Sequence, residues 1–340
     1  MQNFDMGMEN FNARIAVVGL GGQGCNLVNR LTANGIKSAD TIAMNTDVGH
    51  LNMIKAGRKI LLGKDLTKGL GAGGFPEVAA KAVDISRDEI TKALEGYDLV
   101  FVCAGMGGGT GTGSAAPVAK IAKELGSTVI ASVTYPFALE RSRKQKADWG
   151  LERLTKEADT VIVIENDRLL SYAPNLPIEK SFAIIDNITS NAVKGISDTI
   201  MMPSLINIDF ADLRNIVKQG GTAVISIGSG SGPNRVDQAI NSTRTHPLLN
   251  VDYRGAKSAL VHIAGGQNMT ISETTKIGEG VTEGLAGDAN VIFGARVLPE
   301  LNDQLRIMSI VTGVTPKFGA GSSESTEVSS LRMEGLENLY

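Results

Sequence analysis

Nine consecutive residues, 105–113, carry six glycines and two threonines, a composition suited to binding phosphate. Glycine lets the main chain approach a ligand closely and adopt backbone angles that other residues avoid. An apolar run precedes the segment and a helical pattern follows it, so the unpaired N–H groups of a helix start would face the ligand. A plain flexible turn is the alternative, but that many glycines cost backbone entropy that a plain turn has no reason to spend. The residues are Gly105, Gly107, Gly108, Gly109, Gly111 and Gly113, with Thr110 and Thr112 offering hydroxyl donors between them.

This segment is not a Walker A loop, because no Gly-Lys-Ser/Thr follows the glycines to place a lysine at the β- and γ-phosphates. A second glycine cluster, GLGGQGCN at 19–26, follows the apolar run 15–19 and precedes another helical pattern. Taken alone, with Asp47 about 20 residues further on, it favours the dinucleotide-binding unit of an NAD(P)-dependent oxidoreductase. Its GxGGxG spacing differs from the usual GxGxxG, and such an enzyme has no use for a second, richer glycine loop.

Two carboxylates, Asp209 and Asp212, stand three residues apart at an expected helix start, and Asn207 precedes them. This spacing puts both carboxylates on one side of the first helical turn. Aspartate at an N-cap and in a first turn is also favoured by capping and by the helix dipole, so a structural role is the alternative.

Alternating strands and helices must position these residues. In the first half, apolar runs followed by glycine or polar residues predict a Rossmann-like parallel sheet in an α/β fold, with strands at 15–19, 41–44, 99–104, 128–133 and 160–164. Apolar residues at spacings of three and four then predict one helix over 178–202, roughly 35 Å long. Beyond it we expect an α+β domain with a mixed sheet, with strands at 222–228, 259–265, 290–297 and 306–314 and helices at 234–244 and 272–285.

The bulk composition excludes several classes of protein. With 340 residues, 42% of them hydrophobic and 20% charged, the chain is long enough for two domains with separate cores. A net charge of -3 gives no electrostatic footprint for nucleic acid. No apolar run approaches the ~20 residues of a membrane-spanning helix, so we expect a cytoplasmic protein without direct membrane insertion. The two cysteines, Cys25 and Cys103, are expected to be small buried thiols.

The heptapeptide GGGTGTG at 107–113, followed by SAAPVA, resembles the signature loop of the tubulin/FtsZ family, and is closer to FtsZ of the archaeal type than to tubulin. At least six separated motifs fit this family in order between residues 14 and 318. The resemblance implies a cytoskeletal GTPase of cell division, expected at mid-cell. It implies head-to-tail polymerisation, hydrolysis of GTP to GDP at the subunit contact, and activation by self-assembly. A tubulin-like filament GTPase that determines cell shape is the alternative, since it could share every nucleotide motif.

The same resemblance implies which residues contact the nucleotide. The loop at residues 19–26, the family's first loop, would contact the phosphates, and its Asn26 would contact the base. Asn45 belongs to the family's second loop. A third glycine cluster would lie beside the γ-phosphate, although it could be only a surface loop. Asn166 could read a purine edge, Phe182 would stack on guanine and Asp186 would accept from two guanine donors, which favours GTP over ATP. The remaining residues are Gly21, Gly22, Gln23, Gly24 and Cys25 in the first loop, Ala72, Gly73 and Gly74 in the third, and Pro136, Glu140 and either Arg143 or Lys144 near the ribose.

Asn207, Asp209 and Asp212 would orient the attacking water, but in the next subunit, because a helix of ~35 Å separates them from their own nucleotide. We expect Mg²⁺ to be bound mainly through the phosphates and water, with no separate set of protein ligands. The tail would recruit a membrane adaptor or other division proteins. The expected division is a flexible N-terminus 1–12, a GTP-binding domain 13–177, the central helix 178–202, a catalytic loop 203–213, a C-terminal domain 214–316 and a disordered tail 317–340 whose last residues look like a tag remnant.

Overall fold

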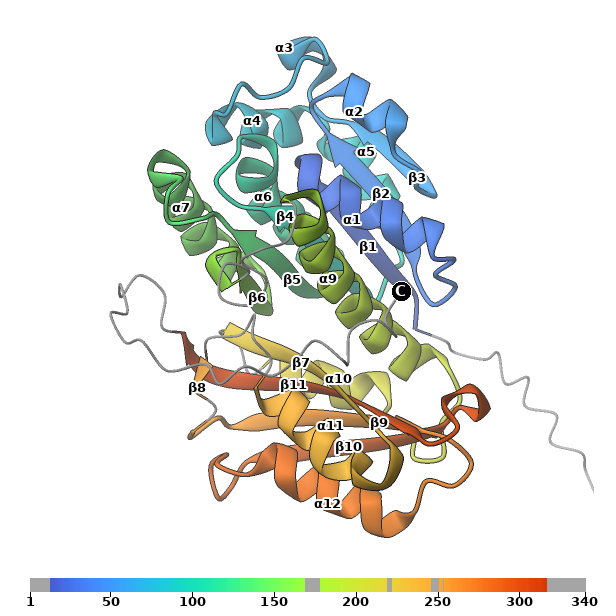
Figure 1. Cartoon of the computed structure of the whole chain (residues 1–340). Coiled ribbons are helices and arrows are strands. Elements are labelled where there is room, and N and C mark those ends of the chain that lie inside the picture. Colours follow the sequence, from blue (N-terminus) through green and yellow to red (C-terminus); the bar gives the residue numbers. More distant parts are fainter. Residues whose placement is uncertain (1–12, 169–177, 219–221, 246–250, 253, 317–340) are drawn as a thin grey trace, which may run out of the picture.

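The computed structural model describes residues 13–168, 178–218, 222–245, 251–252 and 254–316, with the side chains of 178–182, 251–252 and 315–316 left aside. One twisted sheet runs through the chain in the order β10-β9-β11-β7-β6-β5-β4-β1-β2-β3, with β8 paired to β11 (Figure 1). The expected tails, 1–12 and 317–340, lie outside the described residues.

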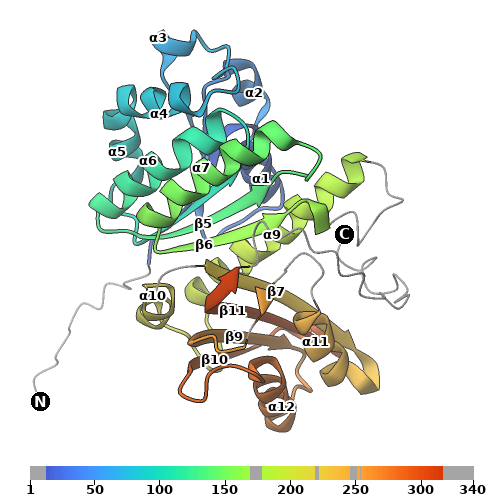
Figure 2. The ribbon, with the colours of Figure 1, turned by 90° about the vertical axis from the view of Figure 1, so that its left-hand side faces the viewer.

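The N-terminal part is a parallel sheet covered on both faces by helices. Its central strands are buried on both faces, as expected of continuous apolar runs in a parallel sheet. Helices α4 to α7 lie over one face in Figure 2, and α1 lies on the other. The strands are β1 Ile15–Leu20, β2 Asp40–Asn45, β3 Arg58–Leu61, β4 Leu99–Gly105, β5 Thr128–Tyr135 and β6 Thr160–Glu165. The helices are α1 Gly21–Ala33, α2 Val48–Met53, α3 Lys64–Thr67, α4 Pro76–Ile85, α5 Arg87–Leu94, α6 Thr110–Glu124 and α7 Arg141–Glu157.

The C-terminal part continues the sheet with mixed polarity. Strand β11 is antiparallel to both β7 and β9, whereas β10 and β9 are parallel. Helices α11 and α12 cover one face over a separate apolar cluster. The elements are α10 Phe210–Lys218, β7 Thr222–Ser231, η1 Gly232–Asn234, α11 Arg235–Arg244, β8 Val251–Asp252, β9 Ser258–Gly265, α12 Ile271–Thr282, β10 Asn290–Val297, η2 Pro299–Leu301 and β11 Gln304–Pro316.

The two parts are joined by a narrow strand contact and by one long helix. Strands β6 and β7 share only two residue pairs among the described residues, Val161 with Thr222 and Ile162 with Ala223. Helix α9, Ile178–Met201, packs through Ala192, Val193 and Ile196 into a core that also contains residues of α1, α10, β9 and β11. The helix therefore spans both parts of the molecule (Figure 1).

The predicted fold class and its strands and helices are confirmed, with ends that differ by a few residues. The clearest difference is at α6, which begins at Thr110 instead of near Ala115, so Gly111 and Gly113 are helical. A Cβ on Gly113 would lie 1.9 Å from the Pro76 carbonyl oxygen, and one on Gly111 would lie 2.6 Å from that of Gly105. These two glycines are required by close packing of the helix against its neighbours, and the turn itself is shorter than expected.

Candidate nucleotide site

The glycine segments 19–26 and 105–113 meet at the carboxyl ends of β1 and β4, which are adjacent parallel strands. Gly21 has φ +67°, and a Cβ there would lie 2.8 Å from the Gly111 nitrogen, so the two turns are in direct contact. Helices α1 and α6 begin at this contact, and neither start has a side-chain cap. Two uncapped helix N-termini side by side favour binding of an anion such as phosphate.

Two glycines face open space. A Cβ on Gly22 or on Gly108 would meet nothing within 4 Å, and both residues line the same pocket. By contrast, a Cβ on Gly24 would lie 2.2 Å from the Cys103 carbonyl oxygen. Close packing therefore explains why residue 24 is glycine. At positions 22 and 108 packing does not require glycine, but a ligand that approaches the main chain would.

The two threonines of the 105–113 segment have different surroundings. The Thr110 and Thr46 hydroxyls lie 2.6 Å apart, which links this segment to the loop after β2. Thr112 is buried, and its hydroxyl accepts the Gly107 N–H at 2.8 Å. Thr112 thus holds the turn in shape, and Thr110 is the half-buried one at the pocket.

The third glycine cluster lies against the 105–113 segment. A Cβ on Gly109 would lie 3.0 Å from the Ala72 Cβ and 3.1 Å from the Gly74 Cα, and Gly73 beside them is exposed. Lys146 of α7 donates to the Gly74 carbonyl at 2.7 Å, and its ammonium lies 5.9 Å from the centre of the Phe75 ring. The cluster is therefore packed beside the pocket and tied to α7.

The start of α7 forms another wall. Gly107 has φ +96°, and a Cβ there would lie 2.8 Å from the Arg143 Cβ. Arg143 lines the pocket and pairs with Glu140 at 2.7 Å, whereas Lys144 lies 5.7 Å from the centre of the Tyr135 ring. Of the two basic candidates, Arg143 is thus the one at the pocket. Pro136 is buried at the end of β5, and a Glu140 oxygen accepts the Phe137 N–H at 3.1 Å.

A smaller hollow lies beside the pocket, and Gln23 lines both. Asp186 of α9 lines it with Gln23 and Gly24, and Gln23 accepts the Thr134 hydroxyl at 2.8 Å. Asp186 lies 3.6 Å from Arg30 of α1, and Arg30 also donates to Asn187 at 2.8 Å. Burial raises the pKa of Asp186 to about 6, outweighing the opposing effect of Arg30.

Asn166 follows the end of β6, where ligands of parallel sheets gather. It is 6% exposed, and no donor within the described part of the chain reaches its Oδ1. A buried amide oxygen without a partner is costly unless a ligand supplies a donor. Phe182 lies in α9, but its side chain is outside the described part, so its expected stacking role stays a prediction.

Asn26 and Asn45 are connected by a residue that the sequence did not reveal, His50 of α2. The Asn26 Oδ1 lies 3.2 Å from His50 Nε2, and the Asn45 Nδ2 lies 3.3 Å from His50 Nδ1. Asn45 is buried, and its Oδ1 also accepts the Thr46 N–H at 2.9 Å. Four residues were missed in this region: Arg30, Thr46, His50 and Lys146. Only Thr46 had a signal, its place between Asn45 and Asp47.

The predicted acidic turn lies at the start of α10. An Asp209 oxygen accepts the Asp212 N–H at 2.7 Å, and Asn207 accepts the Ser204 N–H at 2.7 Å. Asp209 therefore does have the capping role considered as its structural alternative. Asp209 and Asn207 are exposed and Asp212 is half-buried, so all three stay accessible to a partner.

Both cysteines are buried, and burial raises the pKa of each thiol to about 12. The Cys25 thiol donates to the carbonyls of Met44 and Gly19, so Cys25 ties the 19–26 loop to the ends of β1 and β2. Among the described residues, no three His, Cys, Asp or Glu side chains are grouped to hold a metal ion. In the same part of the chain, no helix has the length and apolar character needed to cross a bilayer.

Comparisons with known proteins agree with this geometry. The profile of the tubulin/FtsZ family GTPase domain matches residues 14–174, and that of the FtsZ family C-terminal domain matches residues 221–315. Cell division protein FtsZ 2 of Methanocaldococcus jannaschii is 53% identical over 305 residues, covering 89% of this chain and 80% of that protein. Cell division protein FtsZ 2 of Haloferax volcanii is 50% identical over 319 residues, covering 94% and 80% respectively.

Solved structures extend the similarity to the fold. An FtsZ dimer from M. jannaschii matches with a TM-score of 0.85 at 39% identity, covering 95% of this chain and 96% of that one. CetZ2 from Haloferax volcanii matches with a TM-score of 0.77 at 24% identity, covering 89% and 93%, which shows a shared fold alone. Both domain profiles occur in order, and relatives share about half of its residues over most of its length, so the chain belongs to the tubulin/FtsZ family.

Proposed function

We propose that this protein is a GTPase that assembles head to tail and hydrolyses GTP at the contact between two subunits, acting in cell division. The observation that carries the proposal is the position of the acidic turn relative to the pocket. Asp186, in the first half of α9, lines the smaller hollow beside the pocket, whereas Asp209 and Asp212 come after the helix has ended at Met201. The 15 residues from Asp186 to Met201 rise about 22 Å along the helix axis.

Figure 2 supports this separation, because α10 lies at one edge of the molecule and the start of α9 at the other. The carboxylates of a chain are therefore too far away to act on the nucleotide bound by the same chain. A second copy stacked on the first would bring its acidic turn to the open pocket. Such a head-to-tail contact uses two different surfaces and generates a filament when it does not close into a ring.

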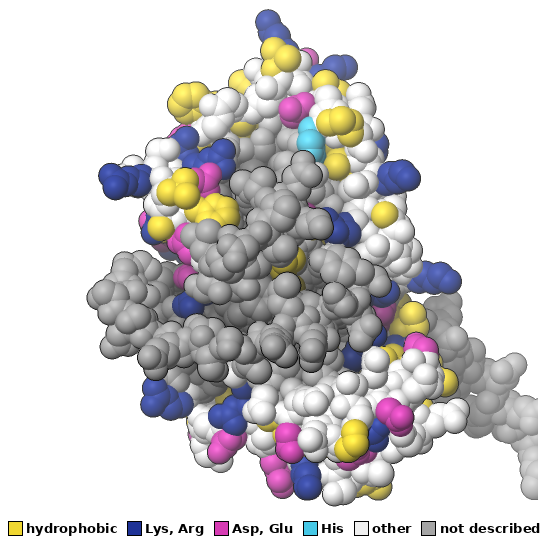
Figure 3. All heavy atoms as spheres, in the orientation of Figure 1, with side chains coloured by type: hydrophobic (Ala, Val, Ile, Leu, Met, Phe, Trp, Pro, Cys, Tyr) yellow, Lys and Arg dark blue, Asp and Glu magenta, His cyan; other side chains and the backbone are white. Residues whose placement is uncertain are grey.

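Exposed apolar side chains at both ends fit this contact. Leu70 is 84% exposed beside the third glycine cluster, and Phe75 is exposed in the same loop. Leu205, 73% exposed, and Ile206 precede the acidic turn. Hydrophobic side chains also show at the upper end of the molecule, over α2 to α4 (Figure 3). Burying two apolar patches against one another would favour association.

The chemistry assigns separate tasks to the two subunits. One subunit binds the phosphates with the main chain around Gly22 and Gly108 and binds guanine through the charged carboxylate of Asp186. The other orients a water in line with the γ-phosphate through Asp209 and Asp212. Mg²⁺, held mainly by the phosphates and water, would neutralise charge that develops during phosphoryl transfer. After hydrolysis the contact at the γ-phosphate is lost, so the filament would weaken.

The relatives support the proposed cellular role. The M. jannaschii and H. volcanii proteins, at 53% and 50% identity, are named for cell division, whereas the CetZ2 match at 24% identity carries the fold alone. We therefore place the protein in the cytoplasm at the division site, with a membrane adaptor as its expected partner. A role in cell shape is the less favoured alternative.

The test is to measure phosphate release and light scattering together at increasing protein concentration with GTP and Mg²⁺. Activity per subunit should be near zero below a threshold concentration and should rise with scattering above it. Activity per subunit that is constant from the most dilute sample upward would contradict a shared site. Nucleotide binding without phosphate release would contradict the enzyme activity itself.

A further inference from the structure

His50 lies between two asparagines of the candidate site. Its Nδ1 is 3.3 Å from the Asn45 Nδ2, and its Nε2 is 3.2 Å from the Asn26 Oδ1. His50 lies in the first turn of α2, where its main-chain N–H donates to Asp47 at 3.0 Å. One imidazole thus connects the end of β2 with an exposed position on α1.

The two amide groups determine which nitrogen of the His50 ring carries the proton. The Asn45 Nδ2 can only donate, so His50 Nδ1 must accept, and the Asn26 Oδ1 can only accept, so His50 Nε2 must donate. A neutral imidazole with its proton on Nε2 satisfies both contacts at once. The ring therefore works as a directional connector with an acceptor at one end and a donor at the other.

This arrangement fixes how the Asn26 amide is presented. Its oxygen is held by His50, and its NH₂ group has no partner within the described part of the chain. Asn26 is exposed on α1, three and four residues after Gln23 and Gly22, which line the pocket. Residues at this spacing lie on one helix face, so the free NH₂ is available to a ligand in the pocket.

We propose that His50 is a positioning residue for nucleotide binding, which orients Asn26 so that its NH₂ donates to an acceptor atom of the bound nucleotide. The inference rests on the proposed nucleotide site and adds to it a residue that need not touch the ligand. Glutamine at position 50 could do the same, since its amide carries both an acceptor and a donor. Leucine has a similar size and can do neither.

The test is to measure GDP and GTP affinities of purified full-length variants by fluorescence titration. His50→Leu should weaken binding about tenfold, the effect of losing one well-placed hydrogen bond of about 1.4 kcal/mol. His50→Gln should bind within about twofold of the wild type. As a matched control, Asn29→Ala removes the bond from the Lys55 N–H to α1 and should leave the affinity unchanged.

A double-mutant cycle tests whether His50 acts through Asn26. In an Asn26→Ala background, His50→Leu should have no further effect on affinity, because the group that it orients is gone. Asn26→Asp should also weaken binding, since it keeps the acceptor for His50 but presents an oxygen where a donor is needed.

Three results would overturn the proposal: His50→Leu binding as tightly as the wild type, additive effects in the cycle, or His50→Gln as weak as His50→Leu. If His50→Leu does not fold, Asn26→Asp and His50→Gln still decide, and unchanged affinity of Asn26→Asp would contradict the proposal. A wild-type protein that binds neither GDP nor GTP would instead contradict the nucleotide site.

Discussion

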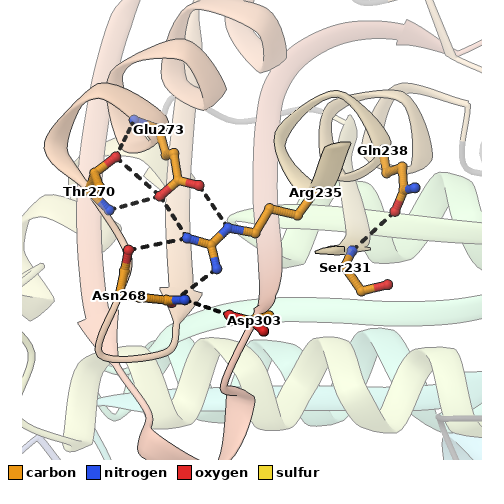
Figure 4. Close-up of polar contacts among 7 residues, drawn as sticks. All are labelled: Ser231, Arg235, Gln238, Asn268, Thr270, Glu273 and Asp303. Atoms are coloured by element: carbon orange, nitrogen blue, oxygen red, sulfur yellow. Dashed lines mark hydrogen bonds and ion pairs between the residues drawn. The ribbon is translucent and has the colours of Figure 1, made fainter. Parts of the chain in front are cut away.

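Two polar clusters of this molecule differ in how fully their hydrogen bonds are satisfied. In the C-terminal part, Arg235 is 7% exposed and donates to both Glu273 oxygens, at 2.7 and 2.9 Å (Figure 4). It also donates to the Asn268 side chain at 3.0 Å, and Asn268 in turn donates to Asp303 at 2.5 Å. Thr270 and Glu273 complete a capping box at the start of α12. The polar side chains of this cluster therefore pair with one another.

The candidate nucleotide region of the N-terminal part, taken with Asn166 and Arg30 around it, is the opposite case. Asn166 has a buried oxygen without a donor in the described chain, and Arg30 has a buried Nε without an acceptor there. Two helix starts lack side-chain caps, and the pKa of Asp186 is raised by burial. Unpartnered buried atoms also occur at Ser38, His262 and Ser309, so the difference between the two regions lies in the open glycine turns and in the raised pKa of Asp186. The comparison therefore separates a cluster whose groups are paired within the chain from a proposed binding site that leaves groups open to a ligand.

The largest effect is expected from filling the open side of the pocket. Gly108→Val would place a side chain where the structure has no atom within 4 Å, so folding should be unaffected. Because that space is where phosphate would lie, GTP affinity should fall at least about a thousandfold, or about 4 kcal/mol. Isothermal titration calorimetry measures the loss. Gly287→Val is the matched control, because it also faces open space but lies in the C-terminal part. Equal affinities of the two variants would contradict the site.

A smaller effect, on stability alone, is expected from breaking the closed cluster. Glu273→Ala leaves the buried Arg235 charge unpaired, so the free energy of unfolding in urea should fall by about 3 kcal/mol. GTP affinity should not change. Glu152→Ala, which breaks the exposed pair with Lys156, should leave stability unchanged. A Glu273→Ala variant that lost nucleotide affinity with its stability intact would reverse the assignment of the two clusters.

The same carboxylate predicts how stability depends on pH. Arg235 lowers the pKa of Glu273 to about 2, below the value of about 4.3 in an unfolded chain. The stabilising contribution is therefore fully present above about pH 4.3 and is lost as the pH falls toward 2. Denaturation curves of the wild type and of Glu273→Gln should converge over this range.

A more modest effect is expected for the choice of base. Asp186→Asn replaces a group that accepts two donors by one that accepts one and donates one. The ratio of GTP to ATP affinity should fall roughly thirtyfold, or about 2 kcal/mol, measured by competition titration. Asp186 also lies close to Arg30, so the loss of one negative charge could by itself change affinity. Asp198→Asn removes one negative charge from the same helix and therefore serves as the control. An unchanged ratio would mean that Asp186 does not read the base.

The smallest effect is the dependence of affinity on pH. The pKa of Asp186 is about 6, and guanine donors require the charged carboxylate, so affinity should rise as the pH rises through 6. Between pH 5 and pH 7 the gain should be about tenfold, and Asp186→Asn should lose it. Folding stability depends on pH in the opposite direction. Because the pKa of Asp186 is raised in the folded protein, this group makes the protein less stable as the pH rises from about 3.8 to 6.

The sequence predicted the frame of the molecule well because its signals are local. Apolar runs such as residues 99–104 and the spacing within 178–202 identify elements without knowledge of their neighbours. Helix α7 begins with Arg141 and buries only Ala147, Gly150 and Leu154, so it offers little apolar periodicity from which to predict it. The strand β3, Arg58–Leu61, and the helices α2 and α3 are too short for a periodic signal, whereas α5 has Ile90, Ala93 and Leu94 at helical spacing over only eight residues.

The site was predicted where glycines and asparagines gather in motifs, and it was incomplete where a role depends on tertiary contact. Lys146 holds the third glycine cluster from a helix 72 residues further along the chain, which no local pattern reveals. Thr112 looked equivalent to Thr110 in the sequence, but only the fold shows that its hydroxyl is occupied by the Gly107 N–H. Side chains that serve the site through another residue leave no signature of their own.

The most direct test of the shared site is to mix two variants, each defective in one half of it. Asp209→Ala with Asp212→Ala keeps the pocket, and Gly108→Val keeps the acidic turn. Each alone should release almost no phosphate. An equal mixture should recover about a quarter of the wild-type rate, the share of contacts that pair an intact pocket with an intact acidic turn. No recovery in the mixture, or full activity of the double aspartate variant alone, would contradict the account.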